Sequence, residues 1–268
     1  MSAIDAMFAR LRQEGRKALM PFVTAGDPDL AFTAEALKRI CQSGASMCEV
    51  GIPYSDPIAD GPVIQASYTR ALQHGVKVTK ILETLGATAR ETTAPLVTMV
   101  SYAIVLRHGL EAYCDLAVAN GVAGLIVPDL PVEESPQLAA VCRARDLSLI
   151  QLVTPTTPRD RALQICETSS GFVYYVSVAG ITGERTALPP ELAENVQWLR
   201  EHASLPVCIG FGISQPEHVR ALGPAADGLI VGSALVRRIA EAATRPRNEV
   251  LDEVAAYVAS LAQAIESL

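Results

Sequence analysis

Two carboxylates bracket a loop that could perform acid–base chemistry. The loop lies in the stretch Glu49–Pro62, EVGIPYSDPIADGP, and the apolar residues around Glu49 are typical of a short buried strand. Burying a lone carboxylate costs several kcal/mol unless it is paired or protonated. Pro53 and Pro57 fix φ and remove backbone donors, so the loop is stiff and can bring Asp60 back over the strand end. Two carboxyls held in different environments suit proton transfer to and from one small molecule.

A purely structural explanation of the two acids is also available. Glu49 would then be satisfied by a neighbouring lysine or backbone amide, and Asp60 would cap the helix that starts after Gly61-Pro62. We favour the functional interpretation because strongly perturbed acids cluster at functional sites, although they are not confined to them.

Composition excludes several classes of protein. The net charge is −7 over 268 residues, which disfavours a nucleic-acid partner. The six cysteines form no CxxC pair and show no metal-ligand spacing with the four histidines, so we expect no metal and a reducing, cytoplasmic location. No apolar run reaches the ~18 residues that a membrane span needs.

Eight short apolar runs alternate with helical segments along the chain. The runs are continuously apolar, as expected for parallel strands that are covered on both faces; they lie at 18–24, 47–51, 96–101, 123–127, 148–153, 172–178, 207–209 and 228–231. The pattern predicts an α/β fold, a single (β/α)8 TIM-barrel domain over residues 1–268, with an extra N-terminal helix and a C-terminal helix. A doubly wound open sheet is the alternative, but it leaves the eighth unit unexplained.

Glycine-rich turns follow the last three predicted strands. They are Gly180–Gly183, Gly210–Gly212 and Gly232-Ser233. Barrels of this class often bind phosphate in the loops after strands seven and eight, where a helix N-terminus offers free N–H groups. The turns therefore predict a small phosphorylated substrate, whose other end would be lined by the apolar side chains of Phe22, Val100 and Phe211.

Five motifs in this order resemble the tryptophan synthase alpha subunit family. They are EVGIPYSDPIADGPVIQ, PDLPVEES, AGITG, GFGIS and IVGSALV, and the similarity runs from about Phe22 to Val236. The first motif is highly specific, whereas the glycine turns alone would also suit other phosphate-binding barrels. The resemblance implies a carbon–carbon lyase of tryptophan biosynthesis that cleaves indole-3-glycerol phosphate to indole and glyceraldehyde 3-phosphate by a retro-aldol reaction, without a cofactor.

The resemblance also assigns roles to individual residues. Glu49 matches the family's general acid/base, which protonates the indole ring carbon, and Asp60 matches the aspartate that holds the indole N–H. Tyr174 matches the tyrosine near the catalytic glutamate, although the adjacent Tyr175 points to the opposite face of the strand and one of the two is expected to be simple packing. Thr182 matches a loop threonine that meets the aspartate, or is merely a turn residue. The phosphate cradle would comprise Gly183, Gly212, Gly232 and Ser233.

The family resemblance further implies a beta subunit in an alpha2-beta2 complex. The docking face is expected on adjacent loops that carry Pro53, Asp56, Pro57 and Ile104. Family members usually have asparagine where this chain has Ile104, which puts partner contact in doubt rather than chemistry. Two alternatives remain at this point: a free-standing lyase, and a weakly catalytic phosphate-binding barrel that activates a partner.

Overall fold

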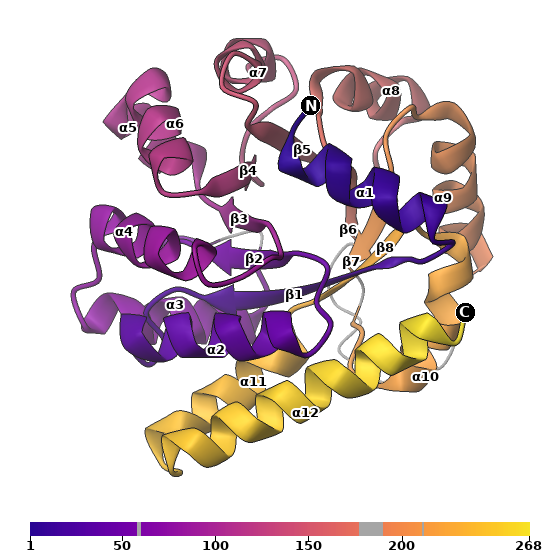
Figure 1. Cartoon of the computed structure of the whole chain (residues 1–268). Coiled ribbons are helices and arrows are strands. Elements are labelled where there is room, and N and C mark those ends of the chain that lie inside the picture. The colour runs from indigo at the N-terminus through magenta and orange to yellow at the C-terminus, as the bar shows by residue number, and fades with distance from the viewer. Residues whose placement is uncertain (58–59, 177–189, 211) are drawn as a thin grey trace.

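Eight parallel strands close into a barrel in strict chain order. The computed structural model describes residues 1–57, 60–176, 190–210 and 212–268 (Figure 1). Residues Ala18–Pro21 of the first strand pair with Gly228–Val231 of the last, which closes the ring. The strands are β1 Ala18–Thr24, β2 Cys48–Gly51, β3 Leu96–Met99, β4 Val122–Ile126, β5 Ser148–Val153, β6 Val173–Val176, β7 Val207–Gly210 and β8 Gly228–Val231.

Helices surround this barrel and confirm the predicted (β/α)8 class, including the extra helix at each end of the chain (Figure 1). Their bounds are α1 Ala3–Gln13, α2 Leu30–Gln42, α3 Pro62–Gln73, α4 Val78–Ala89, α5 Tyr102–His108, α6 Leu110–Ala119, α7 Ser135–Arg143, α8 Arg159–Thr168, α9 Pro190–His202, α10 Pro216–Leu222, α11 Ser233–Ala240 and α12 Arg247–Glu266. Short 3₁₀ turns, η1 Gly223–Ala225 and η2 Glu241–Ala243, follow α10 and α11.

The N-terminal helix closes one end of the barrel. In Figure 1, α1 lies across the barrel opening, and its buried face (Ile4, Met7, Phe8 and Leu11) packs with inward-facing strand residues in one apolar cluster. A capping box with Asp5 starts the helix at Ser2, whose hydroxyl also accepts a hydrogen bond from Ser148 Oγ at 2.9 Å. The chemistry must therefore take place at the opposite, carboxyl-terminal end of the strands.

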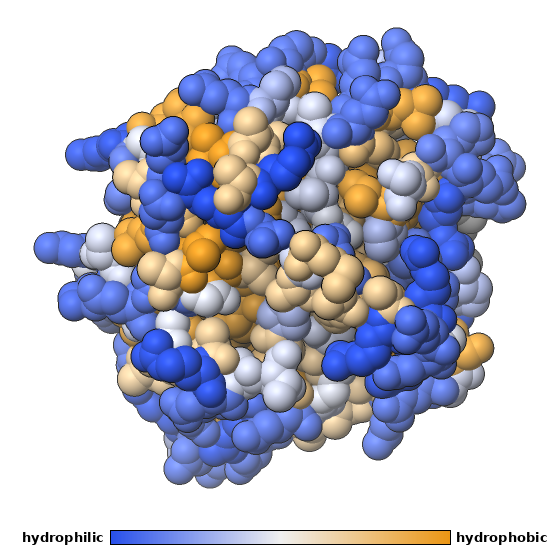
Figure 2. All heavy atoms as spheres, turned by 45° about the horizontal axis from the view of Figure 1, so that its top comes forward, coloured by the Kyte–Doolittle hydropathy of each residue, from blue (hydrophilic) through white to orange (hydrophobic). Residues whose placement is uncertain are grey.

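The face of the molecule that Figure 2 shows is mostly polar. Figure 2 shows hydrophilic side chains over much of one face, with apolar side chains in patches between them. Within the described ranges, no helix has both the length and the apolar character needed to cross a bilayer.

Two local predictions differ from the structure. The segment after β3, expected as a loop, forms α5, because the Ser101 and Asp129 side chains accept hydrogen bonds from the N–H groups of Ala103 and Tyr102 at its N-terminus. A second difference is at α10: Ser214 has the residue type of a helix N-cap, but the N-cap is Gln215, and Ser214 Oγ lies 3.4 Å from His218 Nδ1.

Helix α3 is fixed to the end of β1 by two polar contacts. The Arg70 guanidinium donates to both carboxylate oxygens of Asp27, with Nε–Oδ1 at 2.9 Å and Nη2–Oδ2 at 2.6 Å, and the Asp27 side chain is only 2% exposed. Three residues earlier, the Ser67 hydroxyl lies 2.6 Å from the Thr24 hydroxyl in a buried contact. Since Asp60 stands only two residues before the first residue of α3, these contacts also help to position the loop that carries it.

Removal of the Arg70 guanidinium should destabilise the fold strongly. We expect Arg70→Met to lower the free energy of unfolding by about 3 kcal/mol, because it leaves Asp27 buried and unpaired. The matched control is Arg145→Met, which breaks a similar two-bond pair with Asp115, an aspartate whose side chain is 64% exposed. This control should lose much less, because the exposed pair is screened by solvent. Urea unfolding measures both, and equal losses would contradict the anchoring role of Arg70.

Candidate active site

Glu49 is a fully buried carboxyl inside the barrel. Its strand pairs with β1 at Phe22 and with β3 at Val97, and its side chain is 0% exposed. Both carboxyl oxygens lack a hydrogen-bond partner in the described part of the chain, so neither a lysine nor a backbone amide satisfies them there. Burial raises the pKa of Glu49 to about 8, which makes it a neutral acid at pH 7.

Asp60 stands immediately before α3 and is half-buried. The helix N-cap is Gly61, so Asp60 is not the cap that the structural explanation required. The Gln65 side chain donates a hydrogen bond to the Asp60 carbonyl at 2.8 Å and thereby holds the loop end. Burial raises the pKa of the Asp60 carboxyl to about 6.

The adjacent tyrosines on β6 face opposite sides, as predicted. Tyr174 belongs to the cluster inside the barrel, whereas Tyr175 packs in the outer layer between strands and helices. A Cβ at Gly210 would lie 2.5 Å from the Tyr174 ring, so the glycine lets this ring lie against β7. Burial raises the pKa of Tyr174 well above its usual value, and Glu49 and Asp60 raise it further. Tyr174 therefore shares its surroundings with both acids.

Two further aromatic side chains lie over Gly51, which is two residues beyond Glu49 on β2. A Cβ at Gly51 would fall 2.5 Å from Tyr68 Oη and 2.6 Å from Phe22 Cζ. Phe22 and Tyr68 form a buried cluster with Ile64 and Val236. Phe22, a predicted lining residue, thus lies beside Gly51 together with Tyr68, which the sequence analysis missed. The available signal was Gly51, since glycine inside a strand often marks a close approach by another group.

Val100 does not join this cluster. It is fully buried, but it packs in the outer core between the barrel and its helices, because β3 directs Val97 and Met99 inward. Its predicted place beside the substrate finds no support here.

The predicted phosphate cradle is described in part. Gly232 is the N-cap of α11 and Ser233 is its first residue, and a Cβ at Gly232 would lie 3.9 Å from Phe22 Cβ. The first N–H groups of α11 therefore open beside Phe22, without partners inside the helix. Gly212 has φ +45° and open space around it. Thr182, Gly183 and Phe211 lie outside the described residues.

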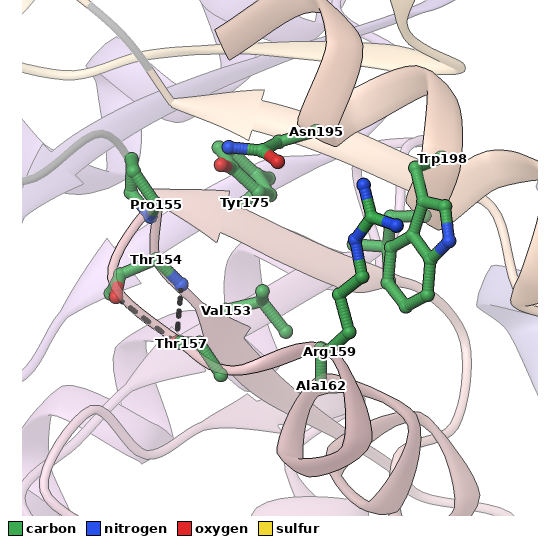
Figure 3. A pocket seen from close by; sticks show the side chains of 10 residues that line it. Val153, Thr154, Pro155, Thr157, Arg159, Ala162, Tyr175, Asn195 and Trp198 are labelled. Carbon is green, nitrogen blue, oxygen red and sulfur yellow. Dashed lines mark hydrogen bonds between the residues drawn. The ribbon is translucent and has the colours of Figure 1, made fainter. Parts of the chain in front are cut away.

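A separate hollow lies on the outer side of the barrel, between α8 and α9. Figure 3 shows Tyr175 and Asn195 on one side and Arg159 along the Trp198 ring, with the guanidinium carbon 4.8 Å from the ring centroid. None of its lining residues is a carboxylate, and it does not include Glu49 or Asp60. In the parts of the chain that the structure covers, no group of three or more His, Cys, Asp or Glu side chains could hold a metal ion.

Comparison with known proteins agrees with this geometry. The family model described as tryptophan synthase alpha chain matches residues 8–266. The chain is 52% identical to the tryptophan synthase alpha chain of Rhodopirellula baltica, with both chains covered in full, and 49% identical to that of Prochlorococcus marinus over 90% of this chain and 88% of the relative. The crystal structure of tryptophan synthase subunit alpha from Legionella pneumophila superposes over the whole of both chains with a TM-score of 0.91 at 34% identity.

The matches extend over nearly the whole chain, and the motif that holds Glu49 and Asp60 lies within them. The chain therefore belongs to the tryptophan synthase alpha chain family, the lyases that cleave indole-3-glycerol phosphate in tryptophan biosynthesis.

Proposed function

We propose that Glu49 and Asp60 divide the acid–base work of the cleavage between them. The neutral carboxyl of Glu49 protonates the indole ring carbon that carries the glycerol chain, which produces a cationic ring. The Glu49 carboxylate that this leaves takes the proton of the adjacent hydroxyl, and the carbon–carbon bond then breaks. Its electron pair returns to the ring to release indole, and the hydroxyl carbon becomes the aldehyde of glyceraldehyde 3-phosphate.

The different pKa values of the two acids carry this proposal. Burial holds the pKa of Glu49 at about 8 and that of Asp60 at about 6. At pH 7 the first carboxyl is mainly protonated and the second mainly ionised, which are the states that a proton donor and a partner for a cationic ring require. The Asp60 carboxylate accepts the indole N–H and offsets the charge that develops on the ring. Tyr174, beside both acids, completes the catalytic group.

The phosphate end of the substrate would bind at the start of α11. Gly232 and Ser233 bring free N–H groups and the positive end of the helix dipole to the same barrel end as Phe22. Gly212, Gly183, Thr182 and Phe211 remain proposed contacts, and Val100 is the least supported of the set. The reaction moves only protons and one carbon–carbon bond, so the proposal assigns no cofactor or metal.

A beta subunit is the proposed partner, in an alpha2-beta2 complex. The family description names one chain of a larger enzyme. On the expected docking face, Asp56 is exposed, whereas Pro53 is buried and Pro57 half-buried. Ile104 lies on α5 rather than on a loop and packs partly on the outer core, and its helix neighbour Leu106 is 52% exposed. The cysteines are free, which suits a cytoplasmic enzyme.

Glu49→Gln should abolish turnover while leaving phosphate binding intact. Glutamine keeps the shape of the side chain but cannot deliver a proton, so we expect kcat to fall by at least about a hundredfold. Steady-state assays with indole-3-glycerol phosphate measure this loss, and Glu133→Gln, which changes an exposed carboxylate paired with Arg161, is the control. Activity within about tenfold of wild type, equivalent to about 1.4 kcal/mol, would refute the assignment.

The pH dependence of kcat/KM should be bell-shaped, with its optimum near pH 7. As pH rises through about 6, Asp60 ionises and activity increases. As pH rises through about 8, Glu49 loses the proton that it must donate, and activity decreases. In Asp60→Asn the residual activity should lose its acid limb relative to wild type. If the activity of the wild-type enzyme does not decrease at alkaline pH, Glu49 is not the proton donor.

Ile104 should weaken docking to a beta subunit whose facing surface carries a polar group at this contact. If the partner keeps its polar group, burying that group unpaired against isoleucine costs roughly 1–3 kcal/mol. We therefore expect Ile104→Asn to bind such a beta subunit more tightly than the natural chain does, in titration calorimetry. Identical affinities would mean that Ile104 does not contribute to docking. Full turnover without any beta subunit would favour a free-standing lyase.

A further inference from the structure

Tyr68 is a buried polar group for which the fold provides no partner. Its side chain is 1% exposed, and no hydrogen bond to its hydroxyl is present among the described residues. A buried hydroxyl without a partner costs free energy, so a role confined to packing would be served better by phenylalanine. Packing alone therefore does not account for the Tyr68 hydroxyl, which suggests a role in the nearby active site.

The position of this hydroxyl is well defined by the contacts of α3. Ser67 contacts Thr24 and Arg70 holds Asp27, so α3 is fixed to the end of β1 both before and after Tyr68. From there the phenol reaches over Gly51, on the inward side of β2 and two residues beyond Glu49. The absence of a side chain at Gly51 creates the space that Tyr68 Oη occupies beside Phe22.

The charged groups around Tyr68 identify what it acts on. Arg70 is the only charged residue of α3 and is occupied by Asp27, while α11 contributes the apolar Val236 to the cluster. Burial raises the pKa of Tyr68 well above its usual value, and Asp60, Tyr54 and Glu49 raise it further, in that order. For Tyr174 the order of the two acids is reversed, with Glu49 before Asp60. The geometry of α3 agrees with this, because helical side chains lean toward the N-terminus of their helix, and Asp60 stands just before the N-terminus of α3.

We propose that Tyr68 is a positioning residue of the active site, whose hydroxyl donates a hydrogen bond to the Asp60 carboxylate in the substrate-bound enzyme and keeps that carboxylate anionic and directed at the indole N–H. This inference rests on the role proposed above for Asp60. This role also explains why Tyr68, a residue of α3, carries a buried hydroxyl that has no hydrogen-bond partner among the described residues.

The test is Tyr68→Phe, which removes one oxygen and keeps the ring that packs on Phe22. Because the hydrogen bond forms in the substrate-bound enzyme, its loss should raise the pKa of Asp60 in that complex, and with it the acid limb of the kcat profile, by about one unit. We therefore expect kcat to fall by up to about tenfold on the acid side of the profile and to change hardly at all at pH 8. The substrate phosphate titrates identically in both enzymes, so the difference between the two profiles reports the protein.

Tyr257→Phe is the matched control. It removes another buried phenol oxygen that has no partner among the described residues, on α12 in the outer core. Its pH profile should superimpose on that of the wild type. If the Tyr68→Phe profile does so too, the proposal fails.

A double-mutant cycle separates action through Asp60 from direct contact with the substrate. The probe is a substrate analogue that lacks the hydroxyl next to the bond to be cleaved, whose affinity at pH 6 is measured by calorimetry. Tyr68→Phe should weaken binding in the natural background and have no further effect in Asp60→Asn. Equal weakening in both backgrounds would overturn the proposal. Full activity of Glu49→Gln and Asp60→Asn would instead overturn the function on which it rests.

Discussion

The constraint on which the site depends is the burial of one carboxyl. Glu49 lies in the apolar interior of the barrel, without a hydrogen-bond partner among the residues that the structure describes, and its desolvation raises its pKa to about 8. In the unfolded chain the group ionises near 4.5, so it reduces stability progressively as pH rises from that value toward 8. At pH 7 this reduction amounts to about 3 kcal/mol, on the order of one large core contact.

The rest of the barrel maintains that environment. Helix α1 closes the far end with apolar side chains, which keeps water away from the interior below Glu49. At the open end, glycines at positions 51 and 210 leave space that Phe22, Tyr68 and Tyr174 occupy. Aromatic rings thus surround the acid where strand side chains would otherwise stand. Gly51 and Gly210 therefore make room for the phenylalanine ring and the two tyrosines that line the site.

Much of this organisation could be predicted from the sequence, because it depends on local patterns. Continuous apolar runs predicted all eight strands, and the position of Glu49 within one of them predicted that its carboxyl is buried. Helix α5 was missed because its seven residues are too few for a periodic signal and its start depends on Asp129, a residue of a different βα loop. Tyr68 was missed because a tyrosine on the apolar face of a helix has the same pattern as ordinary packing. Only the position of Gly51 opposite it reveals that the hydroxyl reaches the barrel mouth.

The closure of the barrel has a consequence for the synthesis of the chain. β1 needs β8 along its second edge, yet roughly 200 residues separate the two strands. At a ribosomal rate of about 5–20 residues per second, that edge waits on the order of 10–40 s for its partner. During this interval the apolar strand ALMPFVT and the buried face of α1 are without their final cover. The nascent chain is thus most exposed to aggregation through these N-terminal segments until β8 has been synthesised.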